Sequence, residues 1–98
     1  MLFTPVTSST PDSSSFSGET NEITVYWRPG CPFCGSLFRQ LERESVPHRR
    51  VNIWDDAAAA AVVRSVANGN ETVPTVMVGT IGLVNPRVSE ILAAAARQ

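Results

Sequence analysis

The chain has no lysine, one histidine and only two cysteines, and each scarcity narrows what it can do. Eight arginines against nine acidic residues give a formal net charge of -1, so no basic surplus exists to capture nucleic acid or a membrane surface. No apolar run approaches the ~18 residues that a membrane-spanning helix needs. Two cysteines are too few for a disulfide-rich secreted scaffold. These absences favour one small globular domain with its chemistry in few residues.

The first 21 residues differ in composition from the rest. Twelve of them are Ser, Thr or Pro, and the apolar ones follow neither the helical nor the strand period. Such a segment buries too little apolar surface to offset the entropy lost on ordering. It also lacks the positive start and apolar stretch of a signal peptide, so we expect a cytoplasmic protein. We predict a disordered tail over residues 1–21 and one domain over residues 22–98, whose eight arginines and seven acids give +1.

The first half of the predicted domain alternates between strand and helix periods. β-Branched and aromatic side chains at residues 23–27 predict a buried strand, which a Pro-Gly pair stops. Cys31-Pro32 then opens a helical pattern of apolar positions that Pro47 ends. Alternation over residues 48–53 predicts a second strand. Two strands separated by a helix imply a parallel pair.

The second half continues with a helix and a hairpin. Asp55 or Asp56 is expected to cap a helix through the alanine-rich segment, and Gly69 stops that helix. Two short apolar strands then flank a two-residue turn, Gly79-Thr80. Glycine in the first turn position suits a type II′ hairpin, which adds antiparallel strands to the sheet.

The final segment predicts a closing helix. Asn85-Pro86 would supply its N-cap and a proline at the first helical position. Its expected apolar stripe comprises Val88, Ile91, Leu92 and Ala95. The complete order is β-α-β-α-β-β-α, which predicts the α/β class with a four-stranded mixed sheet and three helices.

The two cysteines stand at the junction between the first strand and the first helix. With Pro32 as the first helical residue, Cys31 falls on the N-cap, where unpaired N–H groups and the positive end of the helix dipole favour a thiolate. Arg28 adds a nearby positive charge. Cys34, one helical turn further, can attack a mixed disulfide formed on Cys31. The spacing therefore predicts dithiol exchange, with Cys31 as nucleophile and Cys34 as resolving residue.

Two structural roles compete with the redox interpretation of this cysteine pair. A structural zinc site takes four ligands, and the chain adds only His48 to the two thiols. A structural disulfide would close a four-residue loop, which contributes little entropy. A C-x-x-C pair that opens a helix directly after a strand favours redox chemistry over both. No metal is expected.

The sequence resembles the glutaredoxin branch of the thioredoxin superfamily over the whole predicted domain. C-P-F-C at residues 31–34 differs from the common glutaredoxin C-P-Y-C by one hydroxyl, and T-V-P-T-V at residues 72–76 matches the second signature of the family. The segment 69–76 and the pair Asn85-Pro86 are most similar to actinobacterial mycoredoxins. The resemblance implies an α/β thioredoxin fold of the glutaredoxin type.

The resemblance also implies roles for individual residues. Cys31 would attack the substrate disulfide. Pro74 would be cis and would place the Val73 backbone to pair with the cysteine portion of the substrate. Arg28 would lie beside the bound small thiol, and the inner motif residues Pro32 and Phe33 would contribute to substrate binding.

One departure from the family pattern bears on the small thiol. Many glutaredoxins follow the hairpin with a Gly-Gly pair and an acidic residue that grips the amino end of glutathione. Here residues 82–86 read G-L-V-N-P, without Gly-Gly and without Asp. The amide of Asn85 suits a neutral, hydroxyl-rich thiol such as mycothiol better than glutathione.

By this resemblance we expect a thiol–disulfide oxidoreductase that reduces mixed disulfides between proteins and a low-molecular-weight thiol. Mycothiol, or else glutathione, would be the co-substrate, with no tightly bound cofactor. Expected partners are oxidised or thiol-modified proteins and a NADPH-dependent disulfide reductase, with the protein itself a monomer. One alternative is a redoxin that thioredoxin reductase reduces directly. Another is a module in which Cys31 binds an iron–sulfur cluster shared across a dimer.

Overall fold

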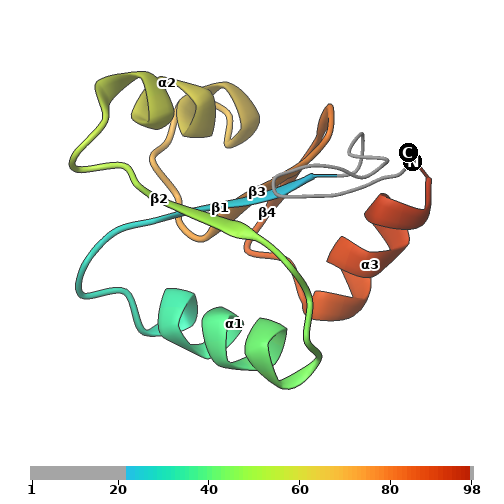
Figure 1. The fold of residues 1–98 in the computed structure, drawn as a ribbon. Helices are drawn as coiled ribbons and strands as arrows, with labels where there is room; N and C mark the ends of the chain where they lie inside the picture. Colours follow the sequence, from blue (N-terminus) through green and yellow to red (C-terminus); the bar gives the residue numbers. More distant parts are fainter. Residues whose placement is uncertain (1–21, 98) are drawn as a thin grey trace, which may run out of the picture.

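The computed structural model describes residues 22–97 and folds them into three layers (Figure 1). In chain order the elements are β1 (Ile23–Trp27), α1 (Pro32–Arg43), β2 (Arg49–Asn52), α2 (Ala57–Val66), β3 (Thr75–Val78), β4 (Ile81–Val84) and α3 (Val88–Ala96). This is the predicted order of strands and helices. The predicted tail over residues 1–21 lies outside the described residues, so the division at residue 22 stays a prediction.

The four strands form one mixed sheet in the order β2-β1-β3-β4. β1 and β2 are parallel, whereas β3 is antiparallel to both β1 and β4. Helix α2 covers one face of the sheet, and α1 and α3 lie on the other (Figure 1). The predicted α/β class, with a mixed four-stranded sheet and three helices, is confirmed. Within residues 22–97 no helix combines the length and the apolar content needed to span a membrane.

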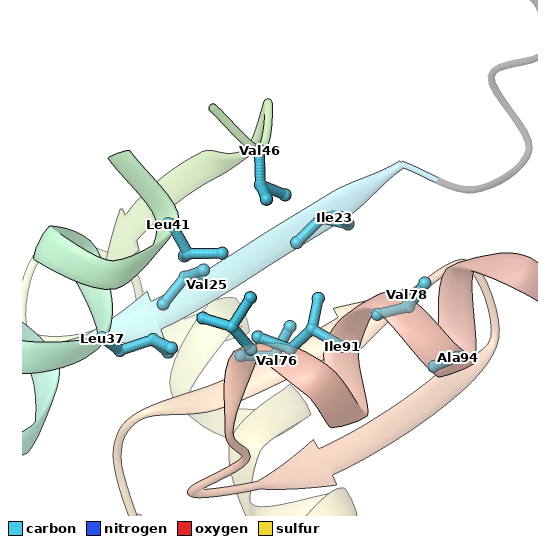
Figure 2. Close-up of a cluster of buried hydrophobic side chains, with 10 residues drawn as sticks. Ile23, Val25, Leu37, Leu41, Val46, Val76, Val78, Ile91 and Ala94 are labelled. Carbon is cyan, nitrogen blue, oxygen red and sulfur yellow. The ribbon is translucent and has the colours of Figure 1, made fainter. Parts of the chain in front are cut away.

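The main core lies between the sheet and the two helices on its α1 and α3 face (Figure 2). Apolar side chains from β1 and β3 meet those from α1 and α3 there, namely Ile23, Val25, Leu37, Leu41, Val46, Val76, Val78, Val88, Ile91 and Ala94. A second cluster packs α2 against the sheet and includes Cys34 together with Ile53, Ala59, Ala60, Val63 and Val73. One of the two cysteines is therefore part of the core, which fixes the start of α1.

Local signals at the helix ends and the hairpin agree with the expectations in most places. Asp56, rather than Asp55, caps α2, because its Oδ1 accepts a hydrogen bond from the Ala59 N–H at 3.1 Å. Gly69 follows α2 with a φ of 90°, a left-handed conformation that glycine adopts without strain. Gly79 has a φ of 60°, as the first central position of a type II′ turn requires.

The start of α3 differs from the prediction. The helix begins at Val88 with Arg87 as N-cap, not at Asn85-Pro86. The Asn85 N–H instead donates to the Pro74 carbonyl at 2.8 Å, with Asn85 in the left-handed region at a φ of 49°. Glu90 then accepts a hydrogen bond from the Arg87 N–H at 2.7 Å, which fixes the first turn.

Two other predictions, on the buried face of α3 and on the end of α1, also differ from the structure. Leu92 is 42% exposed, so the expected stripe of α3 is wrong at that position, and the helix buries Ala94 instead. Helix α1 ends at Arg43, before Pro47, because Ser45 turns left-handed with a φ of 55°. The Val46 N–H then bonds back to the Leu41 carbonyl at 2.9 Å, as at many helix C-termini.

Candidate active site

Three chain segments meet at the edge of the sheet where β1 and β2 end. These parallel strands pair Trp27 with Asn52, so the loops that follow them leave the sheet at the same edge (Figure 1). The Ile53 N–H donates to the Trp27 carbonyl at 2.9 Å and ties the two loops together. The antiparallel strand β3 begins at this edge, which brings the preceding Val73-Pro74 alongside.

Cys31 is the N-cap residue of α1, and Pro32 is the first helical residue, as predicted. The backbone of Cys31 is extended, and its carbonyl accepts the first helical hydrogen bonds, from the N–H groups of Cys34 at 3.2 Å and Gly35 at 3.3 Å. Proline fits the next position because the first helical N–H groups have no partner within the helix. The Cys31 side chain therefore leaves the chain at the positive end of the α1 dipole.

The environment of Cys31 favours its charged form. Partial burial raises the pKa of this thiol by desolvation, but opposing contributions outweigh that effect. The Cys34 thiol and the backbone N–H groups of Cys34 and Phe33 stabilise a thiolate, and the positive charge of Arg28 adds to them. The net result is a pKa for Cys31 below its ordinary value. A partly exposed sulfur whose thiolate is stabilised in this way is suited to act as a nucleophile.

Cys34 has the opposite environment. It is only 2% exposed and packs in the cluster under α2. Burial raises its pKa first, and the hydrogen bond to the Cys31 sulfur and the negative charge there raise it further, to about 12. Two neighbouring thiols thus differ in role, because one is stabilised as a thiolate and the other remains a protonated hydrogen-bond donor.

The segment before β3 faces the nucleophile across the fold. The Val73–Pro74 peptide bond is cis, as the family resemblance implied. The Cys31 sulfur lies 3.6 Å from the Val73 carbonyl oxygen, within reach of an S–H donor. The Thr75 hydroxyl donates to the Thr72 carbonyl at 2.7 Å and holds this turn in shape. The structure thus brings the Cys31 sulfur close to the Val73–Pro74 peptide.

Arg28 lies at the same edge and acts on the thiols through its charge. Its positive charge lowers the pKa of Cys31 and opposes the rise in the pKa of Cys34. Its Nη1 donates to the Pro29 carbonyl at 3.3 Å. The Arg28 guanidinium carbon also lies 5.9 Å from the centre of the Trp54 ring, in a cation–π contact.

The other predicted binding residues are placed less directly. Pro32 is exposed, and Phe33 is 63% exposed on the first turn of α1, next to the thiols in sequence. The backbone of Asn85 is connected to the site, because its N–H donates a hydrogen bond to the Pro74 carbonyl. Its side chain is exposed just beyond β4.

His48, the remaining candidate zinc ligand in the sequence, is engaged elsewhere. Its ring stacks on Phe38 with centroids 6.2 Å apart, and its Nδ1 lies 2.8 Å from the Val46 carbonyl. The Nε2 atom accepts a hydrogen bond from Arg50 at 3.0 Å, so Nδ1 carries the proton and donates to Val46. Across residues 22–97, no three His, Cys, Asp or Glu side chains gather as a metal site would require.

Trp54 is the residue at this edge that the sequence interpretation missed. It follows β2 directly, and the parallel pairing of β1 with β2 is what carries it to the side of Arg28. The available signal was an aromatic residue immediately after a strand parallel to the one that ends at the cysteines. An analysis of the hydrophobic pattern alone assigns such an aromatic residue to the packing of the core.

The fold and the cysteine pair together define a thiol–disulfide oxidoreductase with a thioredoxin-like fold. NrdH-redoxin from Escherichia coli, described as a glutaredoxin-like protein with a thioredoxin-like activity profile, superposes with a TM-score of 0.63 at 26% identity, over 74% of this chain and 92% of that one. The thioredoxin-like protein BC3987 has a TM-score of 0.64 at 22% identity, over 74% of this chain and 99% of that one.

The sequence comparisons narrow this class to one family. The glutaredoxin family model matches residues 23–81, and the chain belongs to the glutaredoxin family. A protein of Mycobacterium tuberculosis assigned to the glutaredoxins is 36% identical over 75 residues, which cover 76% of this chain and 89% of the relative. Mycoredoxin 1 of Corynebacterium glutamicum is 33% identical over 75 residues, which cover 74% of this chain and 91% of the relative.

Proposed function

We propose that this glutaredoxin reduces mixed disulfides between proteins and mycothiol, with Cys31 as the attacking residue. The observation that carries the proposal is the difference between the two thiols, since the pKa of the partly exposed Cys31 is lowered and that of the buried Cys34 is raised. One sulfur is available to attack, and the other is held behind it. In this proposal the protein acts as a cytoplasmic monomer.

The first step exchanges one disulfide for another. The Cys31 thiolate attacks the mycothiol sulfur of the mixed disulfide, and the electron pair of the broken S–S bond leaves on the protein sulfur. That thiolate takes a proton from water, and mycothiol remains joined to Cys31. The Val73 backbone, beside the Cys31 sulfur, supports a role in aligning the cysteine portion of mycothiol.

Two routes can release the mycothiol from Cys31. A second mycothiol thiolate can attack the bound mycothiol sulfur, which forms mycothiol disulfide and returns the Cys31 thiolate. Alternatively, the Cys34 thiolate attacks the Cys31 sulfur, so that mycothiol leaves and an intramolecular disulfide forms. Two causes of the raised Cys34 pKa, the hydrogen bond and the charge of Cys31, vanish once Cys31 is in a mixed disulfide. The second route thus becomes accessible only after the first exchange.

The choice of mycothiol rests on the residues after β4 and on the relatives. The stretch Gly82–Pro86 lacks the Gly-Gly pair and acidic residue that suit glutathione and presents the amide of Asn85 instead. One relative over most of the chain is a mycoredoxin. Asn85 lies beside Pro74 through its backbone, which supports a role for its amide near a bound thiol.

The test supplies the oxidised protein with defined reductants while NADPH consumption is followed. We expect turnover with mycothiol and its NADPH-dependent disulfide reductase, and slower turnover with glutathione and glutathione reductase at equal thiol concentration. The Cys31→Ser variant, which removes the nucleophile, is the matched negative control. Turnover with glutathione that equals or exceeds turnover with mycothiol would contradict the proposal.

The likeness to NrdH-redoxin favours one second candidate, a redoxin that thioredoxin reductase reduces directly. Such a protein shares the scaffold and the dithiol but needs no small-thiol site. The same assay separates the two candidates when thioredoxin reductase is added without any small thiol. Turnover in that mixture, together with none in the presence of mycothiol and its reductase, would establish the redoxin.

A further inference from the structure

The feature that the mechanism leaves unused is the indole of Trp54. This side chain is 65% exposed, although it is among the largest apolar groups in the chain. The other tryptophan, Trp27, is half-buried and packs edge-on against Phe38 with ring centroids 5.9 Å apart. Trp54 therefore contributes little to the core, and its place at the edge of the sheet needs another explanation.

The turn that carries Trp54 is firmly held. The Trp54 N–H donates to Asn52 Oδ1 at 2.9 Å, and the Asp55 N–H donates to the Asn52 carbonyl at 3.1 Å. The Arg28 guanidinium lies over the indole at 5.9 Å from its centre. An exposed aromatic ring fixed by its backbone and by a neighbouring cation is organised before any ligand arrives, which lowers the entropic cost of binding.

The position of this ring relates it to the reactive sulfur. Strands β1 and β2 end at the same edge of the sheet (Figure 1), and Cys31 and Trp54 lie in the segments that follow them. Arg28 contacts the indole and also exerts its charge on the Cys31 thiol, so it links the two. A small thiol joined to Cys31 can therefore extend its non-cysteine portion toward Trp54.

The chemistry of this pair of side chains fits a cyclic polyol. The electron-rich face of an indole attracts the C–H groups of a saturated ring, and flanking polar groups such as Arg28 and the exposed Asp55 can bond to hydroxyls. Mycothiol carries two such rings, glucosamine and inositol, attached to N-acetylcysteine. Mycothiol is neutral. The rim of the site carries one cation, Arg28, and one anion, Asp55, so it suits a ligand without net charge.

We propose that Trp54, flanked by Arg28, binds the sugar and inositol portion of the small thiol and so determines which thiol the protein uses. This inference rests on the proposed function, which it extends from the reacting sulfur to the remainder of the co-substrate. The assignment concerns binding only, because the indole takes no part in the exchange of disulfide bonds.

The test compares two substrates that differ only in the rings. One peptide thiol is joined by a disulfide to mycothiol, and the same peptide is joined to N-acetylcysteine. The second-order rate constant for release of the peptide thiol is measured for each. In the wild-type protein we expect the mycothiol substrate to be preferred. Trp54→Ala should lower this preference about tenfold, and Trp54→Phe, which keeps an aromatic face, should lower it less.

A matched control removes another exposed apolar side chain. Leu92 on α3 is 42% exposed, and Leu92→Ala should leave the preference between the two substrates unchanged. Because the preference is a ratio, a general loss of folded protein or of thiol reactivity cancels from it. Circular dichroism of each variant verifies that the fold is retained.

The outcomes separate this inference from the proposed function. If the wild-type protein prefers the mycothiol substrate and Trp54→Ala keeps that preference, the Trp54 site is wrong and the proposed function stands. If Trp54→Ala slows both substrates equally, the residue acts on the fold or on the thiol, and the binding assignment is again wrong. If the wild-type protein releases no peptide from the mycothiol substrate, the proposed function itself fails.

Discussion

The sulfur of Cys31 lies 3.6 Å from the carbonyl oxygen of Val73, a residue 42 positions further along the chain. This contact joins the start of α1 to the turn before β3, and it places the backbone of that turn beside the reactive atom. The second cysteine, Cys34, is buried in the core. The site therefore offers a substrate one sulfur and one stretch of backbone at the same time.

The unequal thiols predict unequal effects of their replacement. Cys31→Ser should abolish release of a peptide thiol from a peptide–mycothiol disulfide, since a hydroxyl does not form the thiolate nucleophile. Cys34→Ser should keep this first exchange within about a few-fold of wild type, because Cys34 enters only at the second step. Stopped-flow measurement of peptide thiol release tests both. Equal loss in the two variants would contradict the assignment of Cys31 as the sole attacking residue.

The burial difference predicts selective alkylation of the reduced protein. At neutral pH iodoacetamide should modify Cys31 alone, because its thiolate is favoured, whereas burial and a pKa near 12 protect Cys34. Mass spectrometry of the digested protein should locate one adduct at Cys31 and a second only after denaturation. Early labelling of Cys34 in the native protein would show that the buried thiol is more accessible than the structure indicates.

The pH dependence of that alkylation tests the contribution of Arg28. Below the pKa of Cys31 the sulfur is protonated and the rate falls, so the pH midpoint of the rate reports this pKa. A positive charge stabilises the thiolate, and its removal in Arg28→Gln should raise the midpoint only modestly, because Arg28 is the smallest of the contributions. Arg43→Gln, at the opposite end of α1, is the control and should leave the midpoint unchanged. An unaltered midpoint in Arg28→Gln would show that the charge of Arg28 does not act on the Cys31 thiol.

The sequence predicted the elements well where local signals repeat along the chain. Proline after Cys31 marks the first helical residue, so the N-cap position of that cysteine followed from the sequence. The strand and helix periods likewise predicted all the elements of the described domain in order. Such signals involve residues only a few positions apart, so they can be recognised without knowledge of the tertiary contacts.

Two differences from the sequence predictions depend on contacts between distant segments. The start of α3 moved because the Asn85 N–H bonds to Pro74, a partner in the adjacent strand region that no local pattern indicates. The sequence interpretation did not assign Trp54 to the site for the same reason, since only the pairing of β1 with β2 brings this residue to Arg28.

Close packing at Gly82 gives a prediction about stability. A Cβ atom at this position of β4 would lie 2.8 Å from both Val66 methyl groups on α2 and 3.2 Å from the Met77 sulfur. Gly82→Ala should therefore destabilise the domain by about 1–3 kcal/mol, because α2 must move away from the sheet. Val66→Ala removes the clashing methyl groups, so the double variant should be less destabilised than the sum of the two single variants. Urea unfolding of the four proteins measures this coupling, and simple additivity would contradict the close approach.

The cap of α2 gives a prediction that two neighbouring aspartates can test against each other. Asp56 accepts a hydrogen bond from the Ala59 N–H, whereas Asp55 precedes the helix and is exposed. Asp56→Ala leaves that N–H without its side-chain partner and should lower the free energy of unfolding by about 1 kcal/mol. Asp55→Ala, one residue away with the same change in charge, should alter it by less than about 0.5 kcal/mol. Urea unfolding at neutral pH measures both. A larger loss in Asp55→Ala than in Asp56→Ala would show that Asp55, and not Asp56, caps the helix.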